Sequence, residues 1–104
     1  MNEVFDKNYL PKLDLREKLI VLGRDAERIR SFLHQKNIKG KIKSGDCCPI
    51  ANYLKSEGYV EPNCSDMRII VSLQKERFYI YSPLEVSLFI HKFDLGQYPE
   101  LVEQ

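Results

Sequence analysis

The sequence lacks a dominant charge and long hydrophobic runs. Its 104 residues hold 16 lysines and arginines against 15 aspartates and glutamates, a formal net charge of +1. A charge so close to zero provides no global attraction to nucleic acid or to an anionic membrane, so any such binding must be local. Charged residues interrupt the apolar stretches, and the start, Met1–Asp6, has neither the basic end nor the apolar run of a signal peptide. We therefore expect a cytoplasmic protein with no membrane association.

Cysteine is scarce, with three residues, and tryptophan is absent. Three is an odd number, and a reducing compartment keeps cysteines as thiols, so a disulfide framework is not expected. Gly40 and Gly45 have the outer spacing of a phosphate-binding loop, but Asp46 and Cys47 stand where that loop needs lysine and serine or threonine. The sequence also has no dinucleotide fingerprint, nucleophile elbow or metalloprotease helix motif. We expect no catalytic residue and no cofactor.

The length bounds the architecture, because a chain of 104 residues can close one modest core but not two. We therefore predict a single domain over residues 1–104. Residues 1–13 are mixed in character and Pro11 breaks any helix there, which predicts an N-terminal arm. The apolar side chains of this arm that are expected to dock onto the body are Phe5, Tyr9 and Leu10.

Apolar residues between Leu15 and Leu33 follow alternating spacings of four and three, which is typical of one face of a helix. Asp14 is suited to cap the start of this helix. Gly23 interrupts the pattern, and Asp25 is suited to cap a fresh start. The pattern therefore predicts either one kinked helix over residues 14–36 or two helices that divide at Gly23.

A further helix is predicted after the link formed by residues 37–45, which we expect to be an exposed loop or a short edge strand. Cys48 stands at the start of this helix. Pro49 occupies the first helical position, where its missing N–H costs nothing, and Gly58 is suited to close the helix as a C-terminal cap.

Two segments near the middle of the chain predict a β-hairpin. Residues 67–73 alternate between apolar and mostly polar side chains, and the residues 78–81 continue the alternation after a polar link at 74–77. Such alternation predicts a hairpin with one buried face. A turn is predicted ahead of it, at Pro62 and Asn63.

The clearest helix start follows the hairpin. Ser82 is suited to be the N-cap, with Pro83 at the first helical position and Glu85 completing a capping box. Gly96 ends this helix, and residues 98–101 are expected to pack back as a tail. In total we predict an α+β fold in which helices pack on a small antiparallel β-sheet, in the order helix, helix, helix, hairpin, helix.

The order of elements, together with two motifs, resembles a known group of proteins. The motifs are the helix start Cys48-Pro49-Ile50-Ala51 and the ending Phe-Asp-Leu-Gly-Gln-Tyr-Pro-Glu-Leu of residues 93–101. Over residues 25–101 the chain resembles a group of small bacterial and phage proteins for which no activity is established. The resemblance implies the architecture above and a bacterial origin, and it leaves the function open. Cys47 and the residues before 25 depart from the pattern of the group, which makes them poor candidates for a shared role.

Cys48 is the candidate reactive thiol. A cysteine at a helix N-terminus feels the positive end of the backbone dipole, which favours the thiolate, and His34 or His91 is a possible base. The alternative, which we favour, is a small buried residue that only fills space. A metal site is not expected, because the adjacent Cys47 and Cys48 lack the usual spacing of paired zinc ligands and Cys64 stands far along the chain.

Four lysines form a candidate basic patch, namely Lys36, Lys39, Lys41 and Lys43. A local patch of this kind can engage phosphates even when the net charge is near zero. However, the link from residue 37 to residue 47 is much longer than the turn of a helix-turn-helix motif, which is about three or four residues. Nucleic-acid binding through this patch is therefore an alternative rather than the leading hypothesis.

Two tyrosines form a candidate interface. On the predicted hairpin Tyr79 and Tyr81 face away from Phe78 and Ile80, so they are expected on an exposed sheet face. Exposed tyrosines favour a protein partner or self-association. The alternative is that the N-terminal arm or the tail covers them.

The leading hypothesis is a non-enzymatic accessory domain that binds a macromolecule, and the partner is expected to be another protein or a second copy of the chain. Nucleic-acid binding and thiol-dependent chemistry at Cys48 remain as alternatives. An enzyme is the less favoured interpretation.

Overall fold

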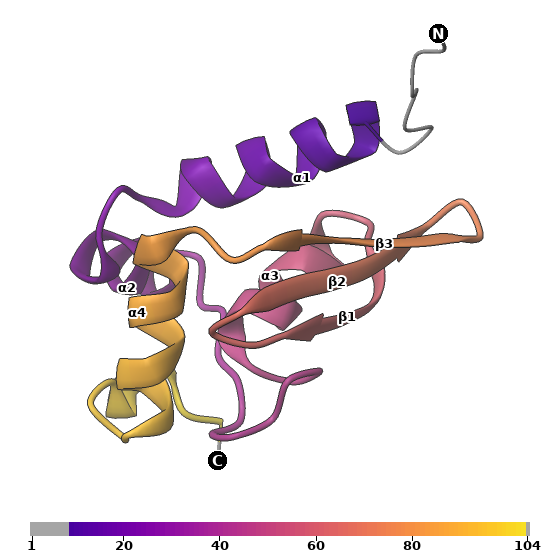
Figure 1. Cartoon of the computed structure of the whole chain (residues 1–104). Helices are drawn as coiled ribbons and strands as arrows, with labels where there is room; N and C mark the ends of the chain where they lie inside the picture. Colours follow the sequence, from indigo (N-terminus) through magenta and orange to yellow (C-terminus); the bar gives the residue numbers. More distant parts are fainter. Residues whose placement is uncertain (1–8, 104) are drawn as a thin grey trace, which may run out of the picture.

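The computed structural model describes residues 9–103, in which helices pack against a small antiparallel sheet (Figure 1). In chain order the elements are α1 (Tyr9–Leu22), α2 (Ala26–Gln35), α3 (Pro49–Ser56), β1 (Val60–Cys64), β2 (Arg68–Leu73), β3 (Glu76–Tyr81), α4 (Leu84–Asp94) and the 3-10 helix η1 (Pro99–Leu101). The strand order is β1-β2-β3, and both neighbouring pairs are antiparallel. The predicted α+β class and the order of helices and hairpin are confirmed, with β1 as an additional strand ahead of the hairpin.

The first periodic segment forms two helices rather than one kinked helix. Gly23 separates them with a φ of +145°, and a Cβ at this position would lie 2.7 Å from the Cβ of Arg28. Asp25 then caps α2 as predicted, because its Oδ1 accepts a hydrogen bond from the Arg28 backbone N–H at 2.9 Å. The glycine therefore supplies both the backbone conformation and the space for a close turn between α1 and α2.

The chain enters α1 earlier than predicted. Residues 9–13 of the predicted arm over residues 1–13 are helical, so the predicted start at Asp14 is wrong. Pro11 lies in the first turn, where the backbone N–H groups have no partner within the helix, and so it does not break the helix. Tyr9 and Leu10 are exposed rather than docked. The rest of the predicted arm, including Phe5, lies outside the described residues.

The predicted hairpin is formed by β2 and β3, with a shorter link than expected. Only Gln74 and Lys75 separate the strands, and both have positive φ values, 54° and 70°. Two left-handed residues in a two-residue loop match the right-handed twist of the flanking strands. On the inner face Ile69 pairs with Ile80, and these side chains are buried in the core.

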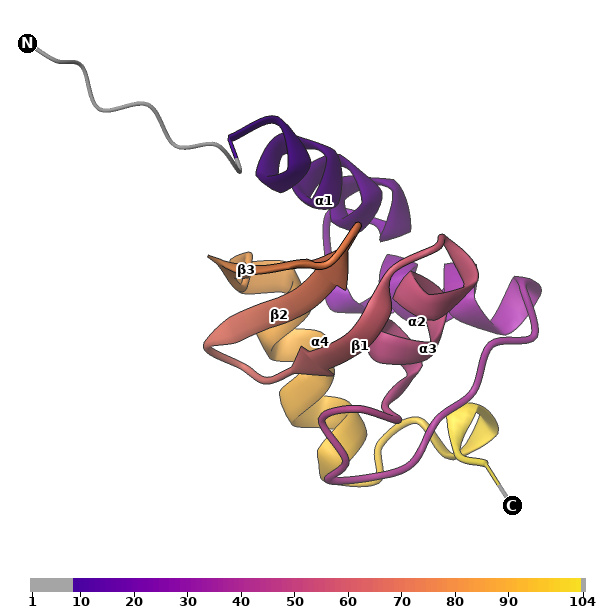
Figure 2. The ribbon, with the colours of Figure 1, turned by 90° about the vertical axis from the view of Figure 1, so that its right-hand side faces the viewer.

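The predicted turn at Pro62 and Asn63 is wrong, because these residues belong to β1. Val60 pairs with Ser72 and Asn63 pairs with Ile70, with a β-bulge between the two pairs. Proline is tolerated in an edge strand, where its missing N–H removes no ladder hydrogen bond. β1 lies at the edge of the sheet, next to α3 (Figure 2).

The start of α4 differs from the predicted capping box. The N-cap position is taken by Pro83, and no side chain caps the helix. Ser82 is instead bound to the sheet end: its Oγ donates to the backbone oxygen of Ser65 at 2.8 Å, and its N–H donates to the backbone oxygen of Met67 at 2.9 Å. The serine therefore joins two chain segments rather than capping a helix.

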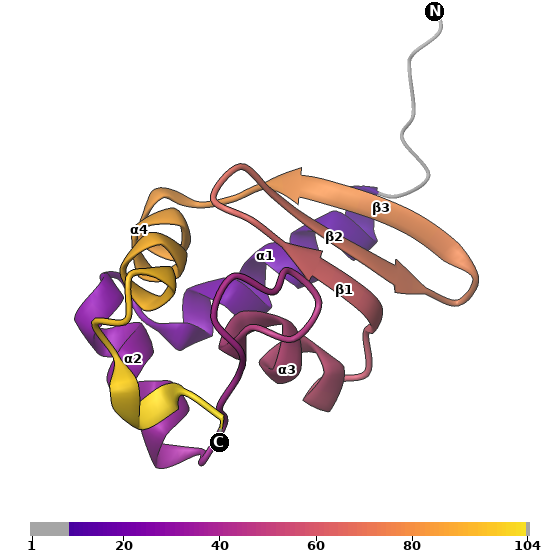
Figure 3. The ribbon, with the colours of Figure 1, turned by 90° about the horizontal axis from the view of Figure 1, so that it is seen from below.

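The C-terminal segment packs back as predicted. Gly96 ends α4 with a φ of +81°, and Tyr98 and Leu101 are buried. Gly40 forms a parallel bridge with Val102: its N–H donates to the oxygen of Leu101 at 2.9 Å. Figure 3 shows the loop between α2 and α3 beside this segment.

Among residues 9–103, no helix has the length and apolar character needed to cross a bilayer.

Candidate functional site

The sheet has an inner face in the core and an outer face that the helices leave open. Strand pairing assigns the outer face, because side chains that are paired across strands point to the same side. The residues of this outer face are Val60, Asn63, Arg68, Ile70, Ser72, Arg77, Tyr79 and Tyr81. The set contains tyrosine, arginine and aliphatic side chains but no carboxylate and no lysine.

Tyr79 and Tyr81 lie on this face along the edge strand β3. Their rings meet edge to face, with centroids 5.6 Å apart and an interplanar angle of 83°. The side chain of Tyr79 is 38% exposed and that of Tyr81 is 68% exposed, as the alternation on β3 predicts. A hydrogen bond to Tyr79 raises the pKa of the Tyr81 hydroxyl. The two rings are thus held in one arrangement while both remain open to solvent.

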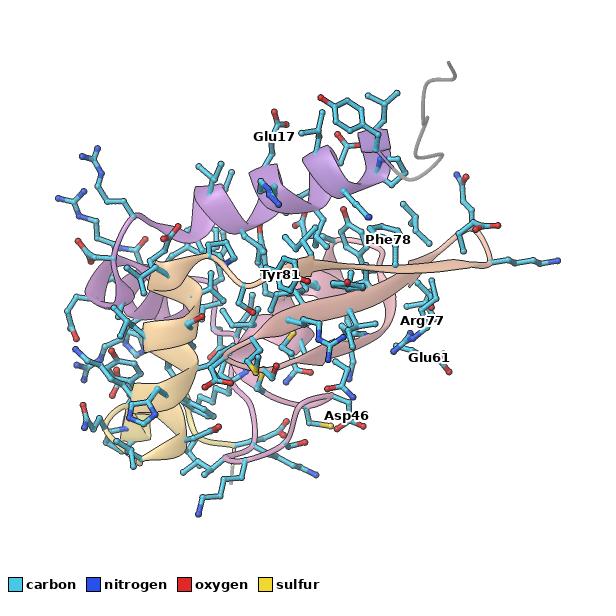
Figure 4. The ribbon with its side chains drawn as sticks, in the orientation of Figure 1. Glu17, Asp46, Glu61, Arg77, Phe78 and Tyr81 are labelled. Carbon is cyan, nitrogen blue, oxygen red and sulfur yellow. The ribbon has the colours of Figure 1, made fainter. Side chains whose placement is uncertain are left out.

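Three cations border the tyrosine pair. The Arg68 guanidinium carbon lies 5.3 Å from the centroid of the Tyr79 ring, and the Lys12 Nζ lies 5.9 Å from the same centroid. Arg77 lies toward the other end of β3, where its Nη1 donates to Ser72 Oγ at 2.8 Å and to the Glu61 backbone oxygen at 3.0 Å. Figure 4 labels Tyr81 at one end of β3 and Arg77 toward the other. The expectation that the N-terminal segment covers the tyrosines holds only in part, since Lys12 of α1 reaches Tyr79 and Tyr81 stays open.

A cleft of about 430 Å³ lies between the loop before α3, the end of β1 and α4. Its lining includes Lys43, Cys48, Cys64, His91 and Asp94. Cys48 is the N-cap of α3 and is 3% exposed, and its Sγ accepts a hydrogen bond from the Ala51 N–H at 3.4 Å. The predicted position of Cys48 at a helix start is therefore confirmed.

The thiol of Cys48 is paired with the thiol of Cys64 rather than with a histidine. A hydrogen bond from Cys64 lowers the pKa of Cys48, burial opposes this, and the backbone N–H groups of Ala51 and Ile50 lower it further. The same contact, with burial, raises the pKa of Cys64 well above its ordinary value. Among the hydrogen bonds of residues 9–103, none joins Cys48 to His34 or His91, although His91 lines the same cleft.

The four lysines of the candidate basic patch are exposed along the loop between α2 and α3. Acidic groups border this loop. The Lys43 N–H donates to Asp94 Oδ1 at 2.9 Å, and the Glu103 N–H donates to the Gly40 oxygen at 2.8 Å, which brings Glu103 beside the loop. Lys36 is turned toward Phe32, with its Nζ 5.6 Å from the ring centroid. Nucleic-acid binding by this patch stays a prediction from the sequence.

The Cys48–Cys64 pair was not foreseen from the sequence, because Cys64 belongs to the strand that was mistaken for a turn. The exposed apolar residues on the outer side of α1 were also missed. The sequence did contain a signal for them, because apolar residues that fall outside the helical spacing of the buried face must lie on the exposed side of the helix. The exposed apolar residues of α1 are Tyr9, Leu10, Leu13, Ile20 and Val21.

Residues 9–103 contain no group of three or more potential metal ligands placed to hold an ion.

Comparisons with protein-family models, with curated proteins and with solved structures find no match to this chain. The resemblance to small bacterial and phage proteins therefore stays an expectation.

Proposed function

We propose that the protein is a non-enzymatic accessory domain that binds another protein through the outer face of its sheet. The observation that carries this proposal is the ordered pair Tyr79 and Tyr81 with Arg68, exposed on a face without any carboxylate or lysine. Tyrosine and arginine supply most of the binding energy in protein interfaces, whereas lysine and the acidic residues are depleted there. The composition of this face is that of an interface core.

The arrangement also reduces the entropy that binding would cost. The edge-to-face contact of the tyrosines and the Arg68 contact at 5.3 Å already restrict these side chains in the free protein. Ordering a flexible side chain on binding costs about 0.5–1.5 kcal/mol, so a surface that is ordered beforehand binds more tightly.

The charge on this face selects the kind of partner. Arg68, Arg77 and Lys12 surround the tyrosines, and Arg77 is fixed by Ser72 and Glu61. A second copy of the chain would bring like charges together across a two-fold axis, which disfavours self-association. We therefore propose a different protein, whose surface presents carboxylates around an apolar patch, and we place this binding in the cytoplasm because the three cysteines are free thiols.

A protein partner is favoured over nucleic acid by the number and position of the cations. Binding a phosphate backbone needs several cations that each neutralise a phosphate. Among the residues that the structure describes, the outer face supplies Arg68, Arg77 and the nearby Lys12, and Arg77 already donates to Ser72 and Glu61. The lysine loop lies elsewhere and is bordered by Asp94 and Glu103.

The test compares three immobilised proteins in native extract from the source cells. They are the wild type, the variant Tyr79→Ser/Tyr81→Ser, and the matched control Leu84→Ser/Leu88→Ser, which removes two exposed apolar side chains from α4. We expect one protein to be captured in stoichiometric amount by the wild type and by the control. The affinity of the captured protein for the tyrosine variant should be at least about tenfold lower than for the wild type, because truncating two anchor residues removes more than about 1.4 kcal/mol of binding free energy. Circular dichroism checks that all three are folded.

A charge reversal, Arg68→Glu, should weaken the same complex and reduce its dependence on salt. The proposal is wrong if capture is unchanged by the tyrosine variant, or if nuclease treatment abolishes it. Analytical ultracentrifugation provides a separate criterion: a wild-type dimer that the tyrosine variant converts to a monomer would replace the proposed partner by a second copy.

A further inference from the structure

Two thiols from different elements meet beneath the cleft. Cys48 belongs to the start of α3 and Cys64 to the end of β1, and an interaction between the two thiols shifts the pKa of each. Both side chains are buried, at 3% and 4% exposure, and both line the cleft of about 430 Å³. A disulfide between them requires the two sulfurs to approach to about 2.05 Å, which a movement of the residues that line the cleft would allow.

We propose that Cys48 and Cys64 form a peroxide-sensitive pair, which hydrogen peroxide entering the cleft converts into an intramolecular disulfide. Disulfides in a reducing cytoplasm are typically transient and redox-sensing rather than structural. The pair is a modification site independent of the outer face, so this proposal does not rest on the proposed protein binding.

The chemistry proceeds in two balanced steps. The Cys48 thiol releases its proton and the thiolate attacks one oxygen of hydrogen peroxide. The O–O bond breaks and the departing hydroxide takes up that released proton to become water, which leaves Cys48 as a sulfenic acid. The Cys64 sulfur then attacks the sulfenic sulfur, an S–S bond forms, and the S–O bond breaks. The hydroxide leaves with the Cys64 proton as a second water. Two thiols lose two electrons in total, and one peroxide is reduced to two waters.

The surroundings assign the two roles. The Cys48 sulfur accepts a hydrogen bond from the Ala51 N–H at 3.4 Å at the N-terminus of α3, and both this bond and the helix dipole stabilise a thiolate. Cys64 lies in β1 and does not cap a helix, so we assign it as the resolving thiol. The cleft gives a small oxidant access to sulfurs that are closed to larger reagents.

Cys47 provides the internal control. It is adjacent to Cys48 and more exposed, but its thiol donates a hydrogen bond to the carboxylate of Asp46 instead of to another thiol. If exposure alone decided which cysteine reacts, Cys47 would be oxidised first. If the contact between the thiols decides, the disulfide will join Cys48 to Cys64 and leave Cys47 free.

The experiment treats the folded wild type and the variants Cys47→Ser and Cys64→Ser with hydrogen peroxide, followed by alkylation and peptide mass mapping without reductant. We expect a Cys48–Cys64 disulfide in the wild type and, at an unchanged rate, in Cys47→Ser. In Cys64→Ser the disulfide should be absent, and dimedone added together with urea, which unfolds the protein and exposes the sulfur, should trap a sulfenic acid at Cys48. Circular dichroism monitors folding, and Cys47→Ser keeps both thiols of the pair if Cys64→Ser fails to fold.

Three results would overturn the proposal. The first is a disulfide that includes Cys47. The second is oxidation of Cys48 to sulfinic acid in Cys47→Ser without formation of the disulfide. The third is complete protection of both buried thiols at a peroxide dose that oxidises the urea-unfolded protein.

Discussion

At the scale of single residues, Cys48 combines packing with helix capping. Its sulfur accepts the Ala51 N–H, one of the amides that have no partner within α3, and Pro49 beside it needs none. Cys48 also fills space in the core. The side chain therefore has a structural role that does not depend on its reactivity.

Replacing this residue, Cys48→Ala, should lower the free energy of unfolding by about 1–2 kcal/mol, because the helix loses its cap and the core loses a sulfur atom. Urea unfolding followed by circular dichroism measures the change. The neighbouring Cys47→Ala should stay within about 0.5 kcal/mol of the wild type, as is usual away from such features. Equal losses in the two variants would contradict the capping role.

Single residues were predictable where the signal is local. Asp25 and Pro49 occupy the N-cap and first-turn positions that their types favour, and Pro49 thereby places Cys48 at the start of α3, because a cap involves only the next three residues. Ser82 has an equally good local signal, but its hydroxyl binds the Ser65 oxygen of a distant segment. The sequence alone does not reveal such a competing acceptor.

At the scale of elements, the loop between α2 and α3 passes directly over the start of α3. A Cβ on Gly40 would lie 2.4 Å from the Pro49 nitrogen and 2.5 Å from the Cys47 oxygen. Both are backbone atoms, which do not move aside as a flexible side chain would. Only glycine allows this approach, so Gly40 positions the cap of α3 and one wall of the cleft.

The variant Gly40→Ala should therefore cost about 2–3 kcal/mol of stability, as expected for overpacking against rigid backbone. The matched control is Gly58→Ala at the end of α3, where φ is +99° and a Cβ would meet no atom within 4 Å. This control should cost about 1 kcal/mol, which is the strain of the left-handed backbone alone. Thermal unfolding ranks the two, and the reverse order would show that the loop can shift away from α3.

Helices and the hairpin were predictable because their periodic patterns extend over many residues. β1 was not, since Pro62 and Asn63 are turn formers by type and the strand contains a bulge. Its pairing partner, β2, determines its conformation. The same dependence hid the Cys48–Cys64 contact, whereas the exposed Tyr79 and Tyr81 followed directly from the alternation on β3.

At the scale of the whole molecule, α2 and α4 are joined to the C-terminal segment by an aromatic and ionic cluster. The Tyr98 ring stacks on Phe89 with centroids 5.2 Å apart, and the Arg30 guanidinium carbon lies 4.9 Å from the Tyr98 ring centroid. Arg30 also forms a two-point ion pair with Glu100, in which Nη2 donates to Oε1 at 2.9 Å. Burial and Glu27 raise the pKa of Tyr98 to about 12.

The Arg30 ion pair makes stability depend on pH. Hydrogen bonding to Arg30 lowers the pKa of Glu100, so its contribution is present above the unfolded pKa of about 4.3 and is lost as the pH falls through the folded value. Glu100→Gln should therefore be less stable than the wild type at pH 7, by up to about 1 kcal/mol for a partly exposed pair. Urea unfolding from pH 7 downward should show this difference shrinking below about pH 4. A difference that stays constant, or an equal effect of Glu103→Gln, would contradict the assignment.

The bridge between Gly40 and Val102 also determines when the native structure can be completed. During synthesis the hairpin and α4 leave the ribosome before Val102 does, so they can fold from contacts between near neighbours in the chain. The loop over α3 gains its bridge partner only once Val102 has emerged. A nascent chain can thus pair the strands that carry Tyr79 and Tyr81 before the loop that leads to the buried Cys48 is held in place.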